Sequence, residues 1–109
     1  MGLDCYVHTT DESDEEVWYG RKENEIHGWM QRKSGVPAED FNCVKLPLTL
    51  ELLEEFRQDA LDGKLTPTSG FFFGCAGETD HVLSMALKLY VACVLAIKSG
   101  KEIYYTSWW

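Results

Sequence analysis

The chain has 109 residues and a formal net charge of −8, and 45% of its residues are hydrophobic. This length suits one domain with one core, and the hydrophobic fraction excludes a disordered chain. Ten basic residues against 18 acidic ones argue against direct nucleic-acid binding, which depends on neutralising phosphates. We therefore expect one compact domain over residues 1–109, whose acidic surface suits a partner with a basic patch.

Residues 3–8 alternate between apolar and polar side chains, a pattern that predicts a half-buried strand. Residues 11–16 hold five carboxylates in six positions, and a second strand-prone stretch follows at 17–20. We expect a β-hairpin with an acidic, solvated loop. The loop lacks the ligand spacing of a calcium-binding loop.

The period then changes to that of a helix over residues 21–33, with Ile26, Trp29 and Met30 facing the core. Residues 41–46 predict a short strand, which Pro47 ends because it cannot donate a ladder hydrogen bond. A second helix is expected to begin after Thr49, a good N-cap.

A glycine-bounded aromatic segment, residues 70–74, leads into the longest apolar run of the chain, residues 82–97. In that run only Ser84 and Lys88 are plainly polar, so a helix here would show water one narrow stripe. We expect it to be the central core element, with other elements packed around most of it. The run is shorter than the roughly 18 to 20 residues that span a bilayer, so no membrane contact is expected.

A last strand over residues 102–106 completes the order β-β-α-β-α-(β)-α-β, where the bracket marks the aromatic segment. Because strands and helices do not alternate regularly, we expect an α+β fold. It should contain an antiparallel or mixed sheet of three to five strands packed on about three helices. The four cysteines, at 5, 43, 75 and 93, include no C-x-x-C pair, and no secretory signal precedes them, which favours reduced thiols in a cytosol.

A polar cluster near the start of the first helix is the main candidate for a ligand site. Arg21 and Lys22 lie at the N-terminal end of the helix, where the macrodipole is positive and cations are mildly unfavourable. A bound anion would offset this repulsion. Asn24 and His27 are three residues apart and so share a helix face. The sequence thus predicts a site for a nucleotide-like anion, made of Arg21, Lys22, Asn24 and His27 with Trp18 and Tyr6 as stacking rings. The alternative is that the two cations pair with the acidic loop and the other polar residues are plain surface.

Other chemistry has weaker signals. Cys75 with His81 or His27 is the only candidate nucleophile and base, and no third orienting residue accompanies it. A zinc site built from His8, His27, His81 and cysteines would lack close ligand pairs. We expect neither a catalytic residue, a metal nor a cofactor.

The C-terminus offers a second kind of site, a protein interface. Trp108 and Trp109 follow Tyr104 and Tyr105, and exposed aromatic side chains are common interface anchors. We take Trp108, Trp109 and Tyr104 as candidate interface residues. The alternative is that they pack on the long apolar helix.

Four landmarks of the sequence carry a family resemblance. They are Gly2-Leu3-Asp4-x-Tyr6, Arg21-Lys22-x-Asn24-x-Ile26-His27, Ser69-Gly70-Phe71-Phe72-Phe73-Gly74 and Glu102-Ile103-Tyr104-Tyr105-x-Ser107-Trp108. Together they resemble a family of small bacteriophage and prophage proteins of uncharacterised function. Residues 77–81 depart from the acidic, aromatic segment usual in that family. The resemblance implies a viral or prophage origin and a host cytoplasm, and supplies no reaction.

Three functions follow as expectations. The first is a non-enzymatic accessory protein that binds and inhibits a host protein, as a defence or takeover factor. The second is the binder of a nucleotide-like anion described above. The third, with least support from the residues, is a small hydrolase that uses Cys75 or His27.

Overall fold

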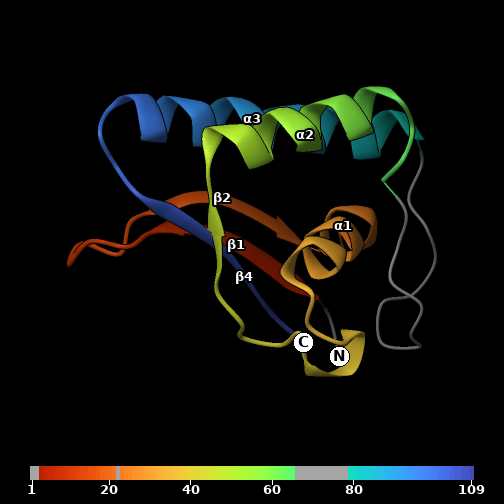
Figure 1. Cartoon of the computed structure of the whole chain (residues 1–109), viewed down its shortest axis with the longest axis horizontal. Coiled ribbons are helices and arrows are strands. Elements are labelled where there is room, and N and C mark those ends of the chain that lie inside the picture. The colour runs from red at the N-terminus through yellow and green to blue at the C-terminus, as the bar shows by residue number, and fades with distance from the viewer. Residues whose placement is uncertain (1–2, 22, 66–78) are drawn as a thin grey trace.

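The structure, a computed structural model, describes residues 3–21, 23–65 and 79–109 (Figure 1). Four strands form one antiparallel sheet in the order β2-β1-β4-β3. The strands are β1 (Asp4–Thr9), β2 (Glu16–Arg21), β3 (Leu46–Leu48) and β4 (Ile103–Trp108). The helices are α1 (Asn24–Ser34), α2 (Leu50–Leu61) and α3 (Thr79–Lys98), and a 3-10 turn, η1, covers Ala38–Asp40. The predicted α+β fold is confirmed, while the aromatic segment 70–74 lies outside the described residues.

Strand β1 is central and shows the alternation that the sequence predicts. Cys5 and Val7 are fully buried on one side of the sheet, whereas Tyr6 and His8 lie on the other. The predicted hairpin of β1 and β2 is confirmed, and its register shifts between Val7 and His8. Strand β4 then pairs with the other edge of β1, so both ends of the chain meet in the middle of the sheet.

The helices lie on one side of this sheet: Figure 1 shows α2 and α3 side by side above it, with α1 below them next to the strands. His27 of α1 contacts Tyr105 of β4. The buried side chains of β1 and β4 meet those of the helices in a single core. Thr49 caps α2 as predicted, because its side-chain oxygen accepts a hydrogen bond from the Leu52 amide at 3.1 Å. The other face of the sheet carries no helix among the described residues.

The expectation that the long apolar helix is wrapped on most sides is wrong. Helix α3 buries Ala86, Leu89 and Cys93 against the sheet and packs along α2. Its outer side faces solvent, with Val91 53% and Leu95 63% exposed. The physical reason is that in this two-layer fold the sheet covers one side of α3 and α2 covers a second side, so the remaining side faces water even though its residues are apolar.

The strand predicted over residues 41–46 is also displaced. Strand β3 covers Leu46–Leu48 and includes Pro47, which a short edge strand tolerates because one side needs no ladder donor. Phe41 instead turns into the core, where it is 1% exposed and stacks on Tyr105 with ring centroids 6.1 Å apart. Cys43 has a positive φ of 62°, which breaks the extended path between these two points.

Candidate functional site

The residues predicted to form the anion pocket are not gathered in one place. Asn24 is 3% exposed and His27 is fully buried, so the outward polar face expected on α1 is wrong. Trp18 is also buried, whereas Arg21 is exposed at the end of β2 and Tyr6 lies on the open side of the sheet. Lys22 lies outside the described residues.

His27 belongs instead to a buried polar group that links α1 to the sheet. Its Nδ1 lies 2.9 Å from the hydroxyl of Tyr105, which in turn contacts the Cys5 thiol. Burial lowers the pKa of His27 to about 4 and raises the pKa of Tyr105 well above its ordinary value. All three groups are therefore neutral at pH 7, and their role is to join α1, β1 and β4.

Among the described residues, two of the three free thiols are buried, and Cys43 is exposed. Burial raises the pKa of Cys5 and of Cys93 to about 12, so neither supplies a thiolate at neutral pH. Cys75 lies outside the described residues. Within the described part of the chain, no group of three or more His, Cys, Asp or Glu side chains could hold a metal ion.

The most developed surface is the open side of the sheet, opposite the helices. Register places aromatic side chains from three neighbouring strands there, because residues paired across strands share a face: Tyr6 lies opposite Tyr19, and His8 opposite Tyr104. We call this surface the aromatic face. It comprises Tyr6, His8, Tyr19, Tyr104 and Trp108.

Four rings of the aromatic face, those of Tyr19, Tyr6, His8 and Tyr104, form a continuous row across the strands. The ring centroids of Tyr19 and Tyr6 are 5.2 Å apart, those of Tyr6 and His8 5.7 Å, and those of His8 and Tyr104 6.2 Å. These separations lie within the range of favourable aromatic pairs. Each ring thus limits the freedom of its neighbour, and the row is held in place before any partner binds.

Carboxylates hold the two ends of this row. The Tyr19 hydroxyl donates to Asp4 Oδ1 at 2.8 Å, and the Tyr104 hydroxyl donates to Asp14 Oδ1 at 3.1 Å. The hydrogen bond to Asp4 raises the pKa of the Tyr19 phenol, so Tyr19 remains a neutral donor. The ammonium of Lys45 lies 4.9 Å from the Tyr104 ring centroid. The face therefore combines flat apolar rings with two hydrogen-bonding acidic groups.

The three predicted interface residues differ in exposure. Trp108 is 68% exposed, whereas Tyr104 is only 8% exposed. The Trp109 indole donates to the Phe41 carbonyl at 2.9 Å, so this ring is tied to the fold. Trp108 and Tyr19, at 43%, are the rings that offer most area to a partner.

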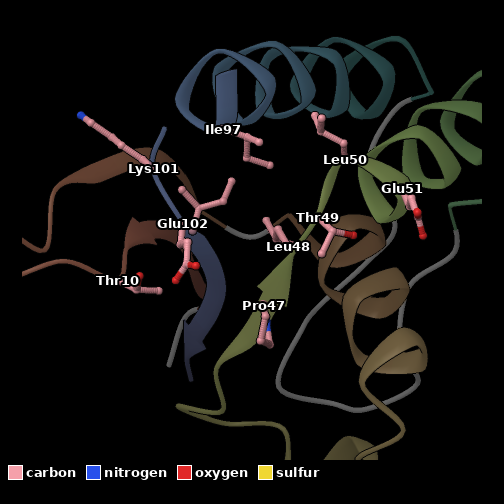
Figure 2. Close-up of a pocket in the computed structure, with 10 residues that line it drawn as sticks. Thr10, Pro47, Leu48, Thr49, Leu50, Glu51, Ile97, Lys101 and Glu102 are labelled. Carbon is pink, nitrogen blue, oxygen red and sulfur yellow. The ribbon is translucent and has the colours of Figure 1, made fainter. Parts of the chain in front are cut away.

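A separate groove of about 720 Å³ opens where the end of α3 meets the start of α2 (Figure 2). Leu48, Ile97 and Ile103 give it apolar walls, and Glu51 and Glu102 bring carboxylates to its lining. Lys101 extends away from it in Figure 2, and its ammonium binds Glu15 at 2.8 Å. The groove has room for an apolar side chain but no cluster of cations for a phosphate.

Sequence reasoning named Tyr6, Tyr104 and Trp108 but assigned them to two different sites. It did not place Tyr19, His8 or Lys45 beside these residues. The alternation in residues 3–8 already placed Tyr6 and His8 on one face, but the register of β1 with β2 and β4 was needed to add the others.

No protein-family model, curated protein or solved structure matches this chain. The resemblance to small phage proteins therefore stays a prediction.

Proposed function

We propose that this chain is a phage-type accessory protein that works in the host cytoplasm, where it binds and inhibits a host protein through the aromatic face. The observation that carries the proposal is the row of four rings in mutual contact, one pair stacked, one tilted and one edge-to-face, on a sheet face that no described helix covers. Aromatic side chains that are already fixed lose little entropy when a partner binds. The role proposed is one of binding and not of catalysis.

The chemistry of the face indicates the kind of partner. Arginine guanidinium groups stack on tyrosine rings and pair with carboxylates, and the exposed Tyr19 with Asp4 offers both. Asp14 adds a second exposed carboxylate beside Tyr104, whose own ring is almost fully covered. The net charge of −8 adds long-range attraction for a basic surface. A host protein with an arginine-containing basic patch fits this combination.

The nucleotide-like anion has less support as the ligand. Its predicted site needs Asn24 and His27 at the surface, and both are buried, while the net charge repels free phosphates. The hydrolase alternative rests on Cys75, outside the described residues, or on His27, whose imidazole is enclosed in the core.

The test compares two variants of the tagged protein produced in host cells. In the first, Tyr19→Ala and Trp108→Ala remove the two most exposed rings of the aromatic face. In the control, Arg32→Ala removes an exposed side chain from the last turn of α1, on the helix side of the sheet. Because interface aromatics often contribute about 2 kcal/mol or more, we expect the first variant to lose captured partner at least tenfold, together with any growth inhibition.

The control variant should capture the same partner at wild-type level, and the binding should weaken as salt is raised. Both variants should unfold near the wild-type temperature. Equal capture by the wild type and the double variant would refute the proposed face.

A further inference from the structure

The outer surface of α2 and α3 carries an aliphatic patch that the proposed function does not use. Among the described residues, four exposed large hydrophobic side chains lie on these two helices: Leu50, Leu61, Val91 and Leu95. On α3, Leu87, Val91 and Leu95 are spaced four residues apart and form one stripe, with Ala92 beside it. We call this the α2–α3 surface. A stripe of this spacing is the usual contact ridge between packed helices.

The charges of the α2–α3 surface are divided between its two helices. From residue 81 to residue 98, α3 has no carboxylate and carries Lys88 and Lys98. Helix α2 carries four carboxylates and a single basic residue. Within the chain, Glu55 pairs with Lys33, Asp59 accepts from the Trp29 indole, and Glu54 pairs with Arg57 and accepts from Tyr90. Glu51, at the start of α2, is therefore the acidic group that faces the lysines of α3 most directly.

We propose that the α2–α3 surface binds a second copy of this chain in a two-fold symmetric dimer. A two-fold axis along the helix direction lays α2 of each copy over α3 of the other, so that Glu51 at the start of α2 faces the end of α3, where Lys98 lies, twice. The leucine and valine side chains then meet in the centre, where Ala92 leaves room for close approach. Elsewhere the net charge of −8 makes two copies repel each other.

A membrane is the other occupant to consider, because α3 is long and apolar enough to cross one by length and composition. Two features favour the second copy. One side of α3 already packs in the hydrophobic core, where Ala86, Leu89 and Cys93 are at most 1% exposed, so this side is not available to lipid. Helix α2 packs along α3, so a membrane that took up α3 would also bring the carboxylates of α2 against its anionic surface, which repels them.

The test measures the mass of the full-length protein by sedimentation equilibrium over a range of concentrations. We expect twice the monomer mass of 12.5 kDa at high concentration and dissociation on dilution. Val91→Glu places a carboxylate in the apolar stripe and should weaken the dimer at least tenfold. Because Val91 is half exposed, the variant should keep the wild-type circular dichroism, and Val91→Ser serves as a milder second variant.

Two further variants separate charge from packing. Lys88→Glu should weaken the dimer and Lys88→Arg should preserve it, while Tyr19→Glu on the opposite side of the molecule should leave it unchanged. A monomeric mass at every concentration would overturn the proposal. So would a dimer that Val91→Glu and Lys88→Glu leave intact, or a monomer that sediments with anionic vesicles. The measurement needs no host protein, so its failure would not bear on the aromatic face.

Discussion

The imidazole of His27 makes the stability of the fold depend on pH. Its pKa is about 4 in the folded chain against an ordinary value of 6.5. Between these values the unfolded chain takes up a proton that the folded chain does not, so the free energy of unfolding falls as the pH falls. We expect a loss approaching about 1.4 kcal/mol per pH unit between pH 6 and pH 4.

Denaturant unfolding at a series of pH values measures this dependence. His27→Asn places a polar but non-titrating group near the Tyr105 hydroxyl and should flatten the curve in that window, even if it lowers stability at pH 7. Identical slopes for the wild type and His27→Asn would show that other groups cause the effect.

Gly20 is the residue where an added methyl group would be most disruptive. A Cβ atom built there would lie 2.5 Å from Trp18 Cη2 and 2.7 Å from Glu23 Cγ, and Trp18 is buried in the core. We expect Gly20→Ala to lower the free energy of unfolding by about 1–3 kcal/mol through overpacking. Thermal unfolding measures this loss. Trp18→Leu replaces the obstructing indole by a smaller side chain. The double variant should therefore lose less free energy of unfolding than the sum of the losses in the two single variants.

At the scale of secondary-structure elements, the cap of α2 has the simplest expected energetics. The Thr49 side chain accepts from the Leu52 amide, one of the donors that the first turn of a helix leaves unpaired. Thr49→Ala should therefore destabilise the fold by about 1 kcal/mol. Thr49→Ser keeps the acceptor and should remain within a few tenths of the wild type. Equal losses in chemical denaturation would assign the effect to the methyl group instead.

Most elements could be predicted from local pattern, because alternation, capping and apolar period are local properties. Strand β1, the hairpin and the start of α2 follow from such patterns. Apart from the displaced strand β3, the errors concern which faces of α1 and α3 are covered. The polar His27 is buried because Tyr105, 78 residues away in the sequence, provides its partner. The apolar Leu95 is exposed because nothing described lies above α3.

The candidate site was only partly predictable for a related reason. Each strand places its own residues on a face, but the sequence does not state which strands are neighbours. The pairing of β1 with both β2 and β4 brings Tyr19 and Tyr104 to either side of Tyr6 and His8. The aromatic face is a property of this strand order, and no single stretch of the chain contains it.

At the scale of the whole molecule, the two proposed surfaces lie on opposite sides of a two-layer fold. A dimer formed through the α2–α3 surface would leave both aromatic faces free and pointing away from each other. Such a dimer can hold two partner molecules, or two sites on an array of them. Binding to a dense surface should then be tighter than binding to one molecule, with no new contact in either site.

This gives a prediction that joins the two proposals. With the captured partner immobilised at low density, wild-type protein and Val91→Glu should dissociate at the same rate, since both keep the aromatic face. At high density the wild type should dissociate at least tenfold more slowly, whereas Val91→Glu should be unaffected by density. Surface plasmon resonance at both densities measures the difference. Density-independent dissociation of a protein shown to be dimeric would refute the α2–α3 surface as the dimer interface, because a dimer formed there leaves both aromatic faces free.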